Sequence, residues 1–265
     1  MIFMEEGFLN SGGYKVHHVT WGDRGPRVLL VHSMGMDGHS MDALAESLEE
    51  EYRVLSLTIL DHGDSDPPRD GISLPDHAEV MRGCYRQLGF SPSVLIGHSV
   101  GGMMGMVLAA EHPDEFKGLV LVDIAPFELT GRSPRPQPPD SFRDEEEALA
   151  WLRERYPGFT PYYYENRLRH AFVEEGGVLR LKPRGDRVRG GLDTDLWPYV
   201  KSIEAPTLLL IGEKSDLVTP ETRERMENTV PDIEAIVVDG TGHMIPQDRP
   251  EEFEKLVRGF LERVY

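Results

Sequence analysis

The chain has 265 residues, with 28 lysines and arginines against 46 aspartates and glutamates, which gives a formal net charge of −18. Such acidity argues against nucleic acid as a partner, because binding to phosphate backbones needs a basic surface. The single cysteine cannot form an internal disulfide, which excludes a disulfide-dependent secreted scaffold. The length suits one large α/β domain with room for an insertion.

The first residues, Met1 to Glu6, have no basic region and no long apolar stretch, so we expect no signal peptide. No run along the chain approaches the roughly eighteen apolar residues that would span a bilayer. The sequence therefore predicts a cytoplasmic protein that makes no contact with membranes.

Strands and helices alternate along the first half of the chain. Strands are predicted at residues 2–9, 14–21, 27–32, 53–60, 93–97 and 118–123, and helices at 42–50, 75–88 and 100–111. The sequence Asn-Ser-Gly-Gly at 10–13 favours a hairpin turn between the first two strands. This alternation predicts a mostly parallel central sheet with helices on both faces.

The alternation stops after residue 126. Four prolines in residues 133–139 rule out a helix or a central strand there, and two helices are predicted beyond them, at 141–156 and 161–175. A strand at 207–211, a helix from 221, a strand at 234–238 and a last helix around Phe253 resume the pattern. Residues 1–126 and 201–265 are thus expected to form the α/β core, and residues 127–200 an insertion into it.

The strongest motif is Gly97-His98-Ser99-Val100-Gly101, which lies between a predicted strand and a predicted helix. It matches the G-x-S-x-G pattern, in which a sharp turn lifts a serine hydroxyl out of the sheet and flanking glycines let the backbones pass. The Val100 N–H would lie at a helix N-terminus, where it can stabilise a developing negative charge. Ser99 is therefore the candidate nucleophile.

A serine nucleophile needs a histidine base that a carboxylate holds in one tautomer. Asp216 follows the predicted strand at 207–211, and His243 follows the one at 234–238, so both lie beyond the carboxyl ends of parallel strands. Asp123 also ends a strand and competes for the acid role, but we favour Asp216.

Two other histidines are expected to have structural roles. His32 and His98 are expected to orient loops through hydrogen bonds. No group of histidine, cysteine and acidic residues has metal-ligand spacing, and no glycine-rich loop has the dinucleotide pattern. We expect neither a metal nor a cofactor.

These residues, in this order, resemble the α/β-hydrolase fold family, in its serine-esterase branch with a helical cap, and the resemblance runs over nearly the whole chain. It implies that residues 127–200 form the cap over the pocket. It also implies a second oxyanion-hole donor in the loop after the third strand, at the Met34 N–H, beside that of Val100. Position 99 is serine, whereas a dehalogenase would need aspartate there.

The chain departs from the family pattern near the expected chemistry. Ser33 replaces the usual glycine of the oxyanion loop, and Thr58, Leu60 and Asp61 replace three residues expected after the fourth strand. We take Ser33, Asp61, Met41 and Met103 as candidate pocket residues.

The resemblance implies a serine hydrolase that cleaves carboxylic esters or lactones through an acyl-enzyme. From the net charge we expect small to medium uncharged substrates. We also expect a monomer or small homo-oligomer. One alternative is a carbon–carbon bond hydrolase with the same triad, which would need a charged pocket for a substrate carboxylate. Another is a weakly active, hydrolase-like binding protein. The arginines expected in the cap, most of them on solvated helix faces, are Arg132, Arg135, Arg153, Arg155, Arg167 and Arg169.

Overall fold

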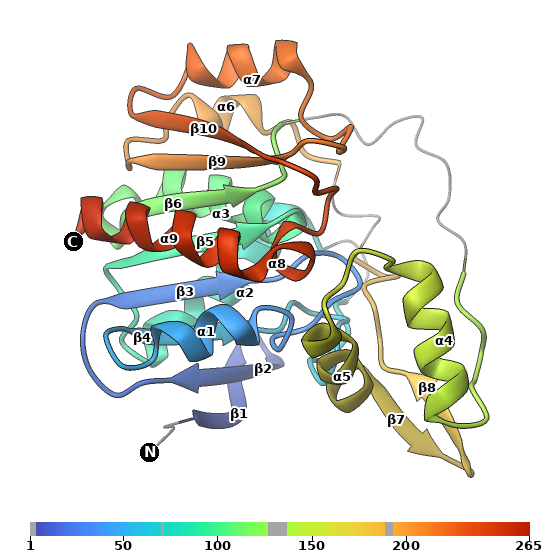
Figure 1. Ribbon diagram of the computed structural model, residues 1–265. Helices are drawn as coiled ribbons and strands as arrows, with labels where there is room; N and C mark the ends of the chain where they lie inside the picture. The colour runs from blue at the N-terminus through green and yellow to red at the C-terminus, as the bar shows by residue number, and fades with distance from the viewer. Residues whose placement is uncertain (1–3, 70–71, 127–136, 189–192) are drawn as a thin grey trace.

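The computed structural model describes residues 4–69, 72–126, 137–188 and 193–265. In these residues, one sheet has the strand order β1-β2-β4-β3-β5-β6-β9-β10 (Figure 1). The strands are β1 (Met4–Ser11), β2 (Tyr14–Trp21), β3 (Arg27–Val31), β4 (Arg53–Leu57), β5 (Ser93–His98), β6 (Phe116–Val122), β9 (Thr207–Gly212) and β10 (Ile233–Val238). Only β2 pairs antiparallel, with β1 and β4, and the other neighbours are parallel. The predicted fold is confirmed.

Helices cover both faces of the sheet because its central strands are apolar on both sides. In β3, Leu29 and Val31 pack into one hydrophobic cluster, and Val28 and Leu30 pack into the other. The first cluster includes residues of α2 (Leu74–Gln87), α3 (Val100–Glu111), α6 (Trp197–Val200) and α7 (Pro220–Glu227). The second includes residues of α1 (Asp42–Leu48) and α9 (Pro250–Val264). Two short helices complete this part, η1 (Pro113–Glu115) and α8 (Ile245–Asp248).

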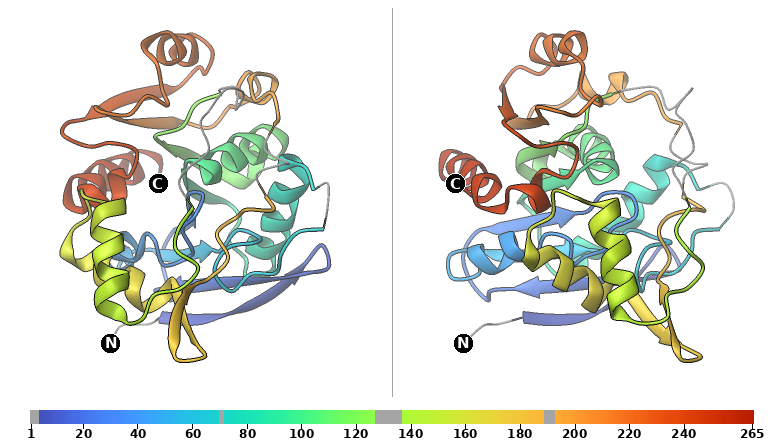
Figure 2. Two further views of the ribbon diagram at one scale, coloured as in Figure 1. Left: turned by 90° about the vertical axis from the view of Figure 1, so that its right-hand side faces the viewer. Right: turned by 45° about the vertical axis from the view of Figure 1, so that its right-hand side comes forward.

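The insertion forms a separate group of elements on one side of the core. They are α4 (Glu145–Arg155), α5 (Pro161–His170), β7 (Phe172–Glu175) and β8 (Val178–Leu181). Both views of Figure 2 keep these yellow and yellow-green elements together. Phe142, Leu152 and Phe172 belong to a third hydrophobic cluster, which Met36 joins from the core.

The predicted helix at 161–175 is too long. It ends at His170, and residues 172–175 form β7, which pairs antiparallel with β8. The two residues between these strands, Gly176 and Gly177, both have positive φ, at 63° and 78°. Two consecutive positive φ angles suit a tight hairpin turn, and glycine adopts them without strain.

The end of the insertion packs with the core. Leu196 and Val200 are buried in the same cluster as the helices α2 and α3. Residues 127–136, which include Arg132, Arg135 and part of the predicted proline-rich loop, lie outside the described residues. Within the described ranges, no helix has both the length and the apolar character needed to cross a membrane.

Candidate functional site

Ser99 lies at a sharp turn between β5 and α3, as the motif predicts. Its backbone has φ 53° and ψ −117°, a left-handed conformation that residues other than glycine rarely adopt. A Cβ atom on Gly97 would lie 2.5 Å from the Gly101 carbonyl oxygen, and one on Gly101 would lie 2.2 Å from the Val31 carbonyl oxygen. Only glycine fits at these two positions, so the tight turn that presents Ser99 depends on them.

Asp123 follows β6 and is fully buried. Its carboxylate accepts three hydrogen bonds, from the Gly212 N–H at 2.9 Å, the Ser215 hydroxyl at 2.5 Å and His243 Nδ1 at 2.7 Å. Burial raises the pKa of this carboxyl, but the hydrogen bonds from His243 and Ser215 outweigh burial and hold the pKa below its usual range. Because Nδ1 of His243 donates to Asp123, Nε2 is left free to act as a base.

The choice of Asp216 as the partner of His243 is therefore wrong. Both aspartates follow parallel strands, but the turn after β9 directs Ser215 toward Asp123 and leaves Asp216 exposed. Asp123, whose carboxylate contacts the His243 ring, has a left-handed backbone conformation with φ 47°. We therefore carry Asp123 forward as the acid.

His98, the neighbour of Ser99, connects the serine turn to the histidine loop. Its Nε2 donates to the His243 carbonyl oxygen at 2.8 Å, and the two rings lie 4.8 Å apart. His32 also orients a loop, since its Nδ1 donates to the Ser33 carbonyl oxygen at 2.8 Å and its Nε2 accepts from the Ile59 N–H at 2.9 Å. The predicted roles of both histidines are confirmed.

Residues 33–36 form a β-turn, closed by a hydrogen bond from the Met36 N–H to the Ser33 carbonyl oxygen at 3.1 Å. Gly35 has φ 83°, which suits the third position of a type II turn. The closing bond does not use the N–H of Met34. Val100 is the first residue of α3, where a backbone N–H has no intrahelical acceptor.

A cavity of about 470 Å³ lies between this turn, the histidine loop and the insertion. Its lining includes Ser33, Met34, Met36, Tyr156, Phe159 and His243. The insertion contributes residues 155–159, which connect α4 to α5. The cavity is therefore shaped jointly by the core and the insertion.

Of the four candidate pocket residues, only Ser33 lines this cavity. Met41 and Met103 are buried in the two hydrophobic clusters of the core, because each faces a layer of helices packed on the sheet. Asp61 accepts the Arg187 N–H at 2.8 Å and so attaches the insertion to the core. None of these three residues lines this cavity.

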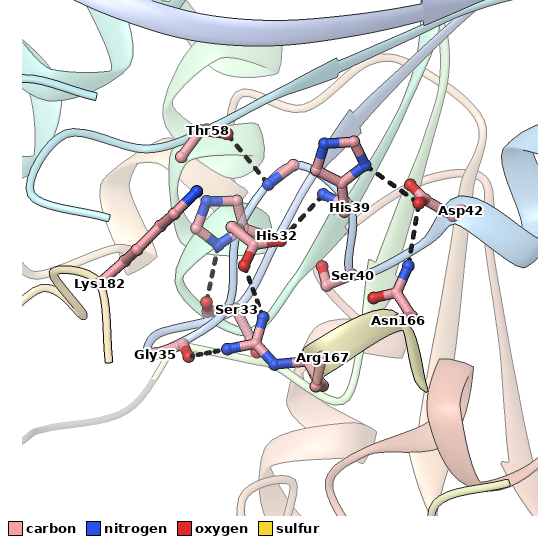
Figure 3. A network of polar contacts seen from close by, with 12 residues as sticks. His32, Ser33, Gly35, His39, Ser40, Asp42, Thr58, Asn166, Arg167 and Lys182 are labelled. Atoms are coloured by element: carbon pink, nitrogen blue, oxygen red, sulfur yellow. Dashed lines mark hydrogen bonds and ion pairs between the residues drawn. The ribbon is translucent and has the colours of Figure 1, made fainter. Parts of the chain in front are cut away.

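The loop that contains the turn is fastened to the insertion by a buried ion pair. Arg167 of α5 contacts Asp37 at 2.6 Å and donates to the Gly35 carbonyl oxygen at 3.3 Å (Figure 3). Thr58, one of the departures from the family pattern, accepts the Gly38 N–H at 3.0 Å. These contacts fix the backbone within the turn and directly after it.

Three fully buried histidines beneath this loop are neutral in the folded protein. Burial lowers the pKa of His32 to about 4 and that of His62 and His77 to about 3, from the usual 6.5. The unfolded chain therefore binds more protons between about pH 4 and 6.5, so the free energy of unfolding falls as the pH falls through this range. At pH 5 each histidine is expected to contribute a loss of about 2 kcal/mol.

Guanidinium denaturation between pH 7.5 and 5 measures this loss. In His77→Gln, the slope of the free energy of unfolding against pH between pH 5 and 6 should correspond to the uptake of about one proton fewer on unfolding. A free energy of unfolding that is constant over this range would contradict the assignment.

One group near the first strands, with one exposed and two buried members, could hold a metal ion. Its members are Glu6, His17 and His39, whose ligand atoms lie within 4.8 Å of one another. Glu6 and His17 already form a hydrogen bond of 2.8 Å. None of the three lines the cavity.

A family model for the alpha/beta hydrolase fold matches residues 26–250. A 2-(acetamidomethylene)succinate hydrolase of Mesorhizobium japonicum is 26% identical over 246 residues, which cover 90% of this chain and 88% of the relative. An esterase of Mycobacterium tuberculosis is 27% identical over 262 residues, which cover 92% and 85%.

Solved structures agree in fold. The crystal structure of an E-2-(acetamidomethylene)succinate hydrolase has a TM-score of 0.88 at 24% identity and covers 98% of this chain and all of that one. A thioesterase domain from the curacin biosynthetic pathway has a TM-score of 0.84 at 26% identity, covering 97% and 99%.

Proposed function

The chain belongs to the α/β-hydrolase fold family and is an enzyme of that class, and on this premise we propose that it hydrolyses carboxylic esters through an acyl-enzyme on Ser99. The observation that carries the proposal is the hydrogen bond between His243 and the buried Asp123, beside a serine held in a left-handed turn. Relatives named as an esterase and a lipase support ester bonds as the target.

In the proposed reaction Ser99 Oγ attacks the ester carbonyl while His243 Nε2 takes its proton. His243 then gives that proton to the leaving alcohol, and the acyl group stays on Ser99. A water molecule, deprotonated by the same Nε2, attacks the acyl-enzyme and releases the acid. Asp123 keeps Nδ1 protonated throughout and stabilises the cationic imidazole.

We further propose that the N–H groups of Met34 and Val100 bind the oxyanion. Support comes from the turn at 33–36, whose closing bond leaves the Met34 N–H unused, and from the position of Val100 at the start of α3. Such donors are worth about 3–4 kcal/mol each in the transition state. Residues 127–200 would act as the cap, since residues 155–159 line the cavity with His243.

Carbon–carbon bond hydrolysis is the second candidate. It uses the same groups but requires a cation for the substrate carboxylate, and Arg155 lines the cavity. The relative from Mesorhizobium japonicum, named for a succinate derivative, also supports it. A weakly active binding protein would have the same site but would not complete the second step.

Rapid mixing with p-nitrophenyl butyrate, followed by acid quench and mass spectrometry, tests the proposal. We expect a burst of about one p-nitrophenol per chain, then steady turnover, with one butyryl group on the peptide that contains Ser99. The peptide that contains Ser33 should stay unlabelled. A burst without turnover would favour a binding protein, and neither burst nor label would contradict ester hydrolysis.

A further inference from the structure

Arg184 lies in a segment that is fixed to the core through its backbone. Gly185 donates its N–H to the Asp61 carbonyl oxygen at 2.7 Å, and the Pro183 carbonyl oxygen accepts the Gly63 N–H at 2.9 Å. Lys182, two residues before, forms an ion pair with Asp64 at 2.6 Å. The position of Arg184 is therefore set by contacts that do not use its guanidinium.

The Arg184 guanidinium lies against the turn at residues 33–36. Its Nη2 would be 3.3 Å from a Cβ atom on Gly35, whose neighbours Met34 and Met36 line the cavity. The other side of the guanidinium faces Trp151, whose ring centroid is 5.6 Å away. Arg184 is not itself one of the residues that line the cavity, and its positive charge lies next to them, against the proposed oxyanion loop.

Within the part of the chain that the structure describes, the exposed carboxylate of Asp186 attracts Arg184 but does not form an ion pair with it. Arg184 forms no ion pair there, and its Nε is buried without a hydrogen-bond partner. Burial lowers the pKa of its guanidinium. Arg167, by contrast, has Asp37 at 2.6 Å. Arg184 is half-buried, and leaving such a cation without an ion pair is costly in a chain that has 46 acidic residues.

Arg155 places a second cation in this region, in the lining of the cavity itself. It lines the cavity and lies over the Tyr156 ring, with 5.0 Å between its guanidinium carbon and the ring centroid. Among the described residues, no carboxylate forms an ion pair with it. Arginine is the side chain best suited to bind a carboxylate, because its planar donors match the two oxygens.

We propose that Arg184 and Arg155 bind a free carboxylate of the substrate, so that the enzyme acts on acyl substrates that carry a carboxylate besides the scissile bond. The inference rests on the proposed function and replaces the expectation of uncharged substrates. That expectation used the net charge of the whole chain, whereas surface charges are screened over about 8–10 Å and the two arginines act at contact distance. The unpaired charge of Arg184 is then neutralised only when substrate is bound.

Matched pairs of esters test the proposal by titration of the released acid. Monomethyl glutarate and methyl valerate have the same chain length and differ in a carboxylate on the acyl side. Acetoxyacetate and ethyl acetate form the corresponding pair for the alcohol side. We expect kcat/KM to favour the anionic member of one pair by tenfold or more, and the pair that shows the preference identifies the side on which the carboxylate is bound.

Arg184→Met keeps the apolar stem and removes the charge. It should reduce kcat/KM for the anionic ester by about thirtyfold or more and leave the neutral ester within twofold. Arg184→Lys should restore part of the preference. The matched control is Arg153→Gln, an exposed arginine on α4, the helix that carries Arg155, and it should change neither ester. Tm of Arg184→Met should be unchanged or higher, because a half-buried charge that forms no ion pair has been removed.

Binding of glutarate, measured by calorimetry, tests the carboxylate site without the need for turnover. We expect the wild type to bind it and Arg184→Met to bind at least tenfold more weakly. If neither ester of a pair is hydrolysed but glutarate binding depends on Arg184, ester hydrolysis fails and the carboxylate site stands. Equal activity on both members of each pair together with no glutarate binding, or an equal loss on both esters in Arg184→Met, would overturn it.

Discussion

Replacing Ser99 with alanine is expected to lower kcat for p-nitrophenyl butyrate by a factor of roughly 10⁵–10⁶, with little change in KM. The variant loses the attacking atom but keeps the cavity and the backbone donors. Ser99 is half-buried, and its side chain makes no capping hydrogen bond to α3, so the fold should not depend on the hydroxyl. Steady-state kinetics and calorimetric Tm on the same preparation check both parts.

Ser33→Ala is the matched control for this variant. Ser33 is a buried serine that lines the same cavity, and its hydroxyl has no hydrogen-bond partner among the described residues. We expect its kcat to stay within tenfold of the wild type. A Ser99→Ala enzyme that keeps more than about one hundredth of the activity would contradict nucleophilic catalysis by Ser99.

Local patterns were enough to predict the sheet and the serine turn. A continuous apolar run such as residues 28–31 has few structures other than a buried parallel strand. The glycines around Ser99 are required by contacts within a few residues, so they can be read from the chain. The two faces of the sheet and the position of His243 beyond β10 follow from the same alternation.

The partner of His243 could not be chosen in this way. Asp123 and Asp216 both follow parallel strands, and only the three-dimensional structure shows which one is buried and which one faces solvent. Arg184 was missed for a similar reason, because nothing in its sequence surroundings indicates that its guanidinium lies against Gly35. Only the folded chain shows that Arg167 has an ion pair and that Arg184 has none among the described residues.

The two aspartates offer a direct comparison. Asp123→Asn is expected to lower kcat by about 10⁴, because an amide cannot hold His243 with Nδ1 protonated and Nε2 free, nor stabilise the imidazolium. The pKa of Asp123 lies below its usual range, so the carboxylate is ionised at neutral pH and the variant removes a full negative charge. Asp216→Asn changes an exposed carboxylate by the same single atom and should leave kcat within twofold.

Ser215→Ala removes one hydrogen bond to the Asp123 carboxylate but keeps its negative charge. Ser215 donates one of the three hydrogen bonds to this carboxylate, and its loss leaves the bonds from Gly212 and His243 in place. We therefore expect kcat to fall by no more than about tenfold, with the pair intact. Parallel measurements of kcat and KM at pH 7.5 on the three variants check the order. If Asp216→Asn were the slow enzyme and Asp123→Asn were active, Asp216 would be the acid despite its exposure, and the loop after β9 would have to rearrange during the reaction.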